Sequence, residues 1–148
     1  MMNQTGPILR FLAKKHGLYP SDDKLAWLAD SFYEFHSDYI PKIAGVVMKG
    51  LDPKVNYEDA VVSYVAEVDK RLAQHGQKFL TGSQFNWADC VAAVMFLCWI
   101  YNDSFAGGSG LNKKGIATVE ANPRVKAYTD TLKTALSGYL ANRGQAPF

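Results

Sequence analysis

The sequence predicts an all-α fold, a bundle of about six helices, from two observations. Apolar residues recur at three- and four-residue spacings along most of the 148 residues, which is the period of one helix face. No segment shows the strict alternation of apolar and polar residues that is typical of a half-buried strand. Because 48% of the residues are hydrophobic and 20% are charged, the composition is that of an ordinary folded domain and not of a disordered chain.

The first half of the sequence predicts three helices. Residues 5–16 form the first, with apolar residues close to its start. The second follows Ser21, has acidic residues in its first turn, and carries an apolar face over residues 25–47. Pro41 is expected to kink or split this helix, because proline donates no backbone hydrogen bond, and Gly50 is expected to end it. The third helix comes next along the chain.

That third helix covers residues 60–72, where valine, tyrosine and leucine repeat with helical spacing. A short helix is expected over residues 113–120. The last predicted helix has Asn122 as its N-cap and Pro123 at its first helical position, and its inner face runs on to Leu140. Between the helix over residues 60–72 and the one over residues 113–120, the sequence predicts one more helix, in its most apolar stretch.

The start of that apolar helix carries a folding signal. Asn86 can cap the backbone N–H of Asp89, and the Asp89 carboxylate can accept from the N–H of Asn86, which is a capping box. Phe85 and Cys90 occupy the two positions of a hydrophobic staple. Because residues 90–101 are apolar on every side, this helix is expected to be the central, buried one.

Three segments resemble one known family. Phe79–Gly82 followed by Trp87–Asp89 resembles the capping-box and staple segment of the glutathione transferase C-terminal domain. Residues 4–19 look like the Gln-Ser/Thr segment and the helix that ends the N-terminal domain of that family. Asn122–Tyr128 resembles its final helix. Because the three segments stand in the family's order and cover nearly the whole chain, the resemblance to the cytosolic glutathione transferases is strong.

The resemblance implies a division of the chain. Residues 1–19 correspond to the remnant of a thioredoxin-like domain, and residues 20–148 correspond to the glutathione transferase C-terminal-like helical domain. Most of the thioredoxin-like domain is then missing, and with it the Tyr, Ser or Cys that activates the glutathione thiol in the family. No residue of this sequence matches that catalytic position.

The resemblance also implies ligand contacts at the start of the first helix. In the family the Gln-Ser/Thr pair binds the γ-glutamyl carboxylate of glutathione, and the match falls on Gln4 and Thr5. The physics agrees, because a helix N-terminus with a hydroxyl side chain is a natural anion site. The alternative is that Thr5 is merely the N-cap of this helix.

Two residues of the second helix fall at further family positions. Asp38 stands where relatives carry an acid that reaches across the dimer to the glutathione ammonium group, and a surface carboxylate is the alternative. Met48 stands where the family lines its electrophile pocket, and the alternative is an ordinary core methionine.

The remaining titratable groups suggest no further site. Cys90 and Cys98 are too far apart along one helix for a disulfide and are interpreted as buried, reduced thiols. His16, His36 and His75 show no metal-ligand spacing and are interpreted as residues of helix surfaces or ends. The sequence predicts no metal site.

Two functions remain open. The first is a glutathione transferase-like protein whose co-substrate is glutathione and whose partner is a small apolar electrophile, with this chain weakly active or inactive alone. The second is a non-catalytic protein–protein interaction module of the same helical type. With a net charge of +2 and basic residues spread along the chain, we expect no nucleic-acid partner.

We expect the protein to be cytoplasmic and to have no membrane partner. The apolar face of the first helix, Ile8, Phe11 and Leu12, is expected to lack a partner. An exposed patch of that kind favours a homodimer or other self-association, or fraying of residues 1–19.

Overall fold

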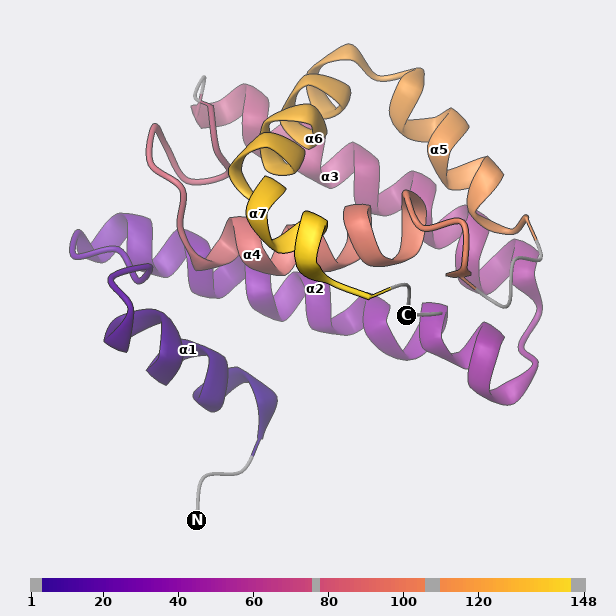
Figure 1. Cartoon of the computed structure of the whole chain (residues 1–148), viewed down its shortest axis with the longest axis horizontal. Coiled ribbons are helices and arrows are strands. Elements are labelled where there is room, and N and C mark those ends of the chain that lie inside the picture. The colour runs from indigo at the N-terminus through magenta and orange to yellow at the C-terminus, as the bar shows by residue number, and fades with distance from the viewer. Residues whose placement is uncertain (1–3, 76–77, 106–109, 145–148) are drawn as a thin grey trace.

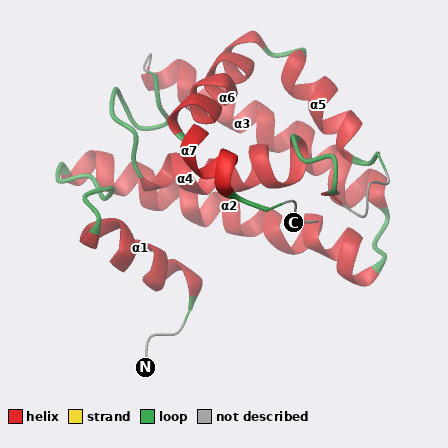
Figure 2. Cartoon of the chain, viewed as in Figure 1, coloured by secondary structure: helices red, strands yellow, loops and turns green. Residues whose placement is uncertain are grey.

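The computed structural model describes residues 4–75, 78–105 and 110–144, and the regular elements within them are helical (Figure 1, Figure 2). In chain order they are α1 (Thr5–Lys15), α2 (Asp23–Lys49), the π-helical turn η1 (Lys54–Glu58), α3 (Asp59–His75), α4 (Trp87–Ala93), the π-helical segment η2 (Val94–Ile100), α5 (Asn112–Glu120), α6 (Pro123–Ala135) and α7 (Ser137–Asn142). The predicted all-α fold is confirmed, with seven α-helices in the described part of the chain where about six were expected.

The helix α4 lies at the centre of the bundle, because it packs against α2 on one side and α6 on the other. The segment η2 extends α4 and packs against α5, while α3 packs against α5 and α6. In Figure 1, α1 lies on the far side of α4 from α5, α6 and α7, beneath the body of the bundle. This placement leaves α1 at the edge of the bundle.

The core is built around one tyrosine. Tyr64 of α3 is fully buried, and its ring contacts the rings of five neighbours from two other elements, among them the His36 ring at 5.8 Å. Phe35 stacks on it at a centroid distance of 5.3 Å, while Tyr39, Phe32 and Phe96 meet it edge-on at 5.4, 6.1 and 5.9 Å. Aromatic pairs of this geometry add about 0.5–1.5 kcal/mol each beyond the area that they bury. The cluster joins α2, α3 and η2.

His36 is part of this core, so its interpretation as a surface residue is wrong. Its side chain is buried, its Nδ1 lies 3.0 Å from the Tyr64 hydroxyl, and its ring stacks on Trp99 at 6.3 Å. The reason is its register on α2, because it follows the fully buried Phe32 by four residues and shares that inward face. Burial lowers the pKa of His36 to about 4, so the ring is neutral near pH 7.

Asp89 is a fully buried carboxylate that joins three segments. It accepts hydrogen bonds from the backbone N–H of Asn86 at 3.0 Å, the backbone N–H of Leu80 at 3.1 Å and the hydroxyl of Tyr128 at 2.9 Å. The Asn86 side chain in turn accepts from the N–H of Ala88 at 3.0 Å, and the capping box is present at the start of α4. The loop before α4, α4 itself and α6 are therefore held by one side chain.

Burial raises the pKa of Asp89 to about 6, although its three hydrogen bonds act in the opposite direction. The free energy lost when the carboxylate is removed from water is larger than the stabilisation that these hydrogen bonds give. The site is thus satisfied in its hydrogen bonding and still disfavours the charged form.

Helix α2 differs from its prediction at Pro41, because it continues without interruption from Asp23 to Lys49. Phe32 before the proline and Ile43 after it are both fully buried, so both halves are held against the same core. Packing on each side compensates for the hydrogen bond that proline cannot make. Gly50 ends the helix in the left-handed conformation with φ of 64°, as predicted.

Two later helices also differ from their predictions. The last predicted helix is divided at Leu136 into α6 and α7, whose backbone there leaves the helical region. The central helix is not buried on every side, because Val94 is 39% exposed and both cysteines are half-buried and free. One face of α4 and η2 therefore reaches the surface, which an entirely apolar sequence could not indicate.

Substitution of Asp89 tests the central role of this carboxylate. Asp89→Ala would leave three buried donors without an acceptor, at about 1–3 kcal/mol each, so we expect a loss of about 3–5 kcal/mol in the free energy of unfolding. The measurement is urea denaturation followed by circular dichroism. Asp130→Asn is the matched control, because Asp130 forms only exposed ion pairs with Lys126 and Lys133, and it should cost less than about 1 kcal/mol. Equal effects of the two changes would contradict the prediction.

The pH dependence of stability should contain two opposing contributions. Between about pH 4 and pH 6, folded Asp89 keeps a proton that the unfolded chain has lost, so its contribution falls as the pH rises. Between about pH 4 and pH 6.5, unfolded His36 binds a proton that the folded chain does not, so its contribution rises with pH. With roughly 2 pKa units each and about 1.4 kcal/mol per unit, the two nearly cancel.

Single variants should separate these contributions. In urea denaturation from pH 4 to pH 7, Asp89→Asn should make stability rise with pH more steeply than in the unaltered chain. His36→Gln should make it fall. Parallel curves for all three proteins would show that neither group titrates as described.

Candidate functional site

The first helix is held close to the bundle by a glycine. Gly6 of α1 is buried against the Tyr33 ring of α2, and a Cβ placed on it would lie 2.8 Å from the Tyr33 Cε1 atom. Ala13, two turns further along α1, is also buried. Gly6 lets the backbone of α1 approach the Tyr33 ring, and Ala13 is buried as well, so α1 is docked and not frayed in the described residues.

A polar and aromatic cluster fixes the same face of this helix. Arg10 donates from Nε to Asp30 at 3.0 Å, and the Tyr19 hydroxyl donates to the second oxygen of Asp30 at 3.1 Å. The Arg10 guanidinium lies 5.5 Å from the centre of the Trp87 ring. That indole stacks between Tyr19 at 6.1 Å and Tyr33 at 5.5 Å. Partial burial, followed by the bond to Asp30, raises the pKa of Tyr19.

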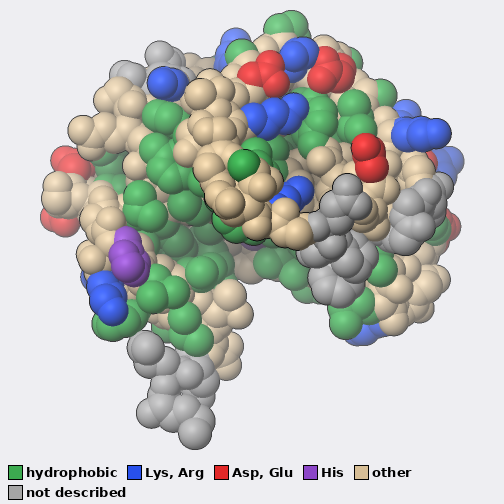
Figure 3. Space-filling view, in the orientation of Figure 1, with side chains coloured by type: hydrophobic (Ala, Val, Ile, Leu, Met, Phe, Trp, Pro, Cys, Tyr) green, Lys and Arg blue, Asp and Glu red, His purple; other side chains and the backbone are tan. Residues whose placement is uncertain are grey.

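Between α1, α2 and α4 lies an apolar groove of about 400 Å³, which we call the α1 groove. Its walls come from Leu9 and Leu12 of α1, Tyr33 and Ile40 of α2, and Val94 beyond α4. Figure 3 shows hydrophobic side chains gathered over this side of the molecule, with a concave outline beside α1. A groove of this size and apolarity suits an apolar ligand or the apolar face of another segment.

The start of α1 opens onto this groove. Thr5 is the first residue of the helix and lines the α1 groove, whereas Gln4 is the N-cap residue and its side chain makes no capping bond. The alternative interpretation of Thr5 as the N-cap is therefore wrong. Gln4 has φ of 71°, and it is the one non-glycine residue with positive φ in the described part of the chain. Such a conformation costs about 1–3 kcal/mol and is found most often at functional sites.

Asp38 and Met48 lie elsewhere on α2. Both are exposed, and neither is among the residues that line the α1 groove. Met48 is 80% exposed and, at 1.5 Å per residue, lies roughly 22 Å along the helix from Tyr33. Its interpretation as a core methionine is therefore wrong. The structure brings Thr5 to the groove but brings neither Asp38 nor Met48 to it.

Several residues that dock α1 onto the bundle were not predicted from the sequence. A glycine inside a helical pattern can indicate close backbone approach, so Gly6 carried a usable signal. Arg10, Asp30 and Tyr33 carried none, because nothing in their spacing indicates that α1 and α2 meet. Within the described residues, no helix combines the length and apolarity needed to cross a bilayer, and no three His, Cys, Asp or Glu side chains are placed to hold a metal ion.

Comparison with known proteins identifies relatives of this chain. The sequence model described as "Glutathione S-transferase, C-terminal domain" matches residues 26–131. Glutathione S-transferase A4 of Mus musculus is 34% identical over 94 residues, which are 60% of this chain and 42% of that protein. Glutathione S-transferase 3 of Gallus gallus is 28% identical over 134 residues, 84% of this chain and 57% of that protein. The chain thus spans about half the length of these curated relatives.

Solved structures agree with this match. The glutathione S-transferase of Ascaris lumbricoides superimposes on this chain with a TM-score of 0.77 at 17% sequence identity. Na-GST-3 of Necator americanus, which is described as monomeric, superimposes with a TM-score of 0.76 at 22% sequence identity. Each comparison covers 99% of this chain and 71% of the other. These likenesses show the fold, and the sequence match, which covers more than half of the chain, shows the family. The chain therefore belongs to the glutathione S-transferase family, and its matched residues form the C-terminal domain of that family.

Proposed function

We propose that this chain is the helical part of a cytoplasmic glutathione transferase. The reaction is the attack of the glutathione thiolate on a small apolar electrophile, which forms a thioether. Family membership supports the reaction class. The α1 groove supports an apolar ligand or an apolar protein surface beside it.

The observation that carries the proposal is the start of α1. The first N–H groups of a helix have no partner within that helix, and they carry a partial positive charge. Thr5 adds a hydroxyl at this position and lines the groove, and Gln4 precedes it with a positive φ of 71°. This arrangement suits the γ-glutamyl carboxylate of glutathione, which would accept from the Thr5 hydroxyl and from backbone N–H groups.

In this proposal residues 1–19 are the last part of a thioredoxin-like domain, and residues 20–148 are the helical domain. The group that activates the glutathione thiol belongs to the remainder of the thioredoxin-like domain. We therefore expect the 148-residue chain alone to bind glutathione weakly and to conjugate it slowly or not at all.

The proposed roles of Asp38 and Met48 require a second protomer or a further segment. Neither side chain lines the α1 groove. Asp38 would pair with the glutathione ammonium across a homodimer, and Met48 would contact the electrophile. An exposed carboxylate and an exposed thioether are available for such contacts.

A second function is favoured by one observation. Leu9, Phe11 and Leu12 of α1 are 37%, 49% and 41% exposed on a helix that is otherwise firmly docked. An apolar surface on a rigid helix is suited to protein–protein contact. The alternative is therefore a non-catalytic interaction module, which would bind a protein partner without binding glutathione.

Calorimetry with glutathione distinguishes the two functions. We expect weak, millimolar binding by the 148-residue chain, and a loss of about 5–10-fold in affinity for Thr5→Ala because one hydrogen bond to a charged group is removed. Thr118→Ala is the control, because the Thr118 hydroxyl bonds only to the Lys114 carbonyl on the surface of α5. Absence of any heat of binding, or equal affinities for both variants, would favour the module.

Self-association is a separate prediction. Sedimentation velocity should show a concentration-dependent increase in size for the unaltered chain, because the apolar face of α1 is exposed. Leu9→Ser with Phe11→Ser should reduce it. Trp27→Ser should not, although Trp27 is 65% exposed, because it lies on α2 outside the α1 groove. A chain that stays monomeric at every concentration would contradict this expectation.

A further inference from the structure

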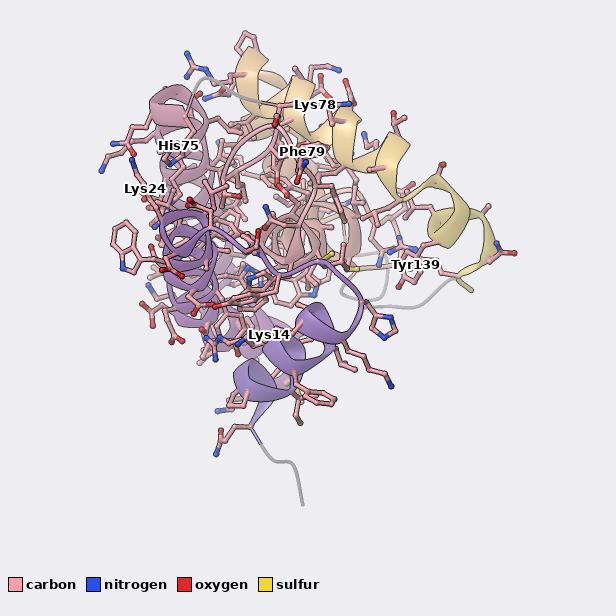
Figure 4. All side chains as sticks on the ribbon, turned by 90° about the vertical axis from the view of Figure 1, so that its left-hand side faces the viewer. Lys14, Lys24, His75, Lys78, Phe79 and Tyr139 are labelled. Carbon is pink, nitrogen blue, oxygen red and sulfur yellow. The ribbon has the colours of Figure 1, made fainter. Side chains whose placement is uncertain are left out.

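A second apolar groove lies between α4, η2 and α7, and we call it the cysteine groove. It has a volume of about 230 Å³, and Cys90, Cys98, Val94, Leu136, Tyr139 and Arg143 are among the residues that line it. Tyr139 on α7 is labelled in Figure 4, where α7 lies to one side of the bundle and well away from Lys14 of α1. The cysteine groove shares Cys90 and Val94 with the α1 groove, and its other lining residues do not line the α1 groove.

Arg143 holds one of the two thiols. Its Nη1 atom donates to Cys98 Sγ at 3.4 Å, and its Nη2 atom donates to the Leu97 carbonyl oxygen at 3.0 Å. Two bonds from a planar guanidinium fix the cation beside the sulfur. The geometry therefore places a cation and a thiol side by side in the lining of the groove.

Cys90 lines the same groove but has the opposite environment. Burial raises the pKa of Cys90 to about 11, and the neighbouring Asp89 carboxylate acts in the same direction. Its thiol therefore stays protonated near pH 7. The groove thus contains one thiol beside a cation and one thiol beside a buried acid, which makes Cys90 an internal control for Cys98.

The remaining walls of the groove indicate what the thiol would meet. Val94 and Leu136 are apolar, and Tyr139 contributes a half-open aromatic wall, since its side chain is 60% exposed. A small or medium-sized apolar molecule fits such a groove. The one cation in its lining, Arg143, still has N–H donors beyond the two bonds described, because a guanidinium carries five.

We propose that the cysteine groove is a covalent modification site, at which Cys98 adds to apolar α,β-unsaturated carbonyl compounds. The apolar chain of the compound lies against Val94 and Leu136. Its carbonyl oxygen faces Arg143. This reaction uses the chain's own thiol and does not depend on glutathione or on the function proposed above.

The addition is balanced without an oxidant or a leaving group. The Cys98 sulfur forms a bond to the β-carbon of the compound. The electron pair of the carbon–carbon double bond then forms a double bond between the α-carbon and the carbonyl carbon, and the π pair of the carbonyl group moves onto its oxygen. Arg143 donates hydrogen bonds to this enolate oxygen, where negative charge develops. The proton released by the thiol returns through solvent to the α-carbon, which leaves a thioether and a restored carbonyl group.

Peptide mass spectrometry over a time course tests the proposal on the purified chain at pH 7. The probes are trans-2-nonenal, which has an apolar chain, and acrolein, which has the same reactive group without one. We expect Cys98 to react with nonenal about 10-fold faster than Cys90. Relative to a small free thiol, Cys98 should favour nonenal over acrolein, because only nonenal can occupy the groove.

The matched variants are Arg143→Gln and Arg124→Gln. Arg143→Gln should slow modification of Cys98 about 10-fold and leave Cys90 unchanged. Arg124→Gln removes an arginine that pairs with Asp69 outside the cysteine groove, and it should change neither rate. Thermal unfolding of both variants checks that they fold. Equal rates at the two cysteines, no effect of Arg143→Gln, or no preference for nonenal would each overturn the proposal.

Discussion

The buried carboxylate of Asp89 is the interaction on which the bundle depends. A charged or polar group removed from water must be matched by hydrogen bonds, and Asp89 obtains them from Asn86 and Leu80 before it and from Tyr128 far along the chain. The same side chain therefore starts the central helix, orders the loop before it and fixes α6. An apolar residue of the same size could fill the space, but it could not direct three segments to one point.

The structure also shows how two buried titratable groups share one core. Burial disfavours charge at both groups, so it raises the pKa of Asp89 to about 6 and lowers the pKa of His36 to about 4. Tyr128, which donates to Asp89, packs edge-on against Phe96, and Phe96 contacts Tyr64, the partner of His36. The polar and aromatic parts of the core are therefore one continuous set of contacts.

Most of the fold could be predicted from the sequence, because its signals are local. The capping pair Asn86 and Asp89, the N-cap Asn122 and the terminating Gly50 each act within a few residues, and their helix boundaries lie where the pattern places them. Features that depend on contacts between distant segments were missed. The burial of His36 and the exposure of Met48 follow from packing, which the spacing of apolar residues along one helix does not specify.

The candidate site was predictable only in part for the same reason. The family resemblance selected Gln4 and Thr5, and of these two residues Thr5 lines the α1 groove. The Arg10–Asp30 pair and the Trp87 stack could not, since they join α1 to two other helices. The sequence also did not indicate the π-helical continuation of α4, because a run of apolar residues has no periodicity that distinguishes a π-helix from an α-helix.

That continuation has a consequence for how the sequence can change over evolution. A π-helical segment closes its hydrogen bonds over one residue more than an α-helix, so each of its residues advances less around the axis. Within Val94–Ile100 this wider winding helps to keep Cys98 on the same side as Cys90 and Val94. Loss of a single residue here would restore α-helical winding and change which side chains of the segment face the cysteine groove. A change in the length of this segment would therefore alter the groove as well as the core.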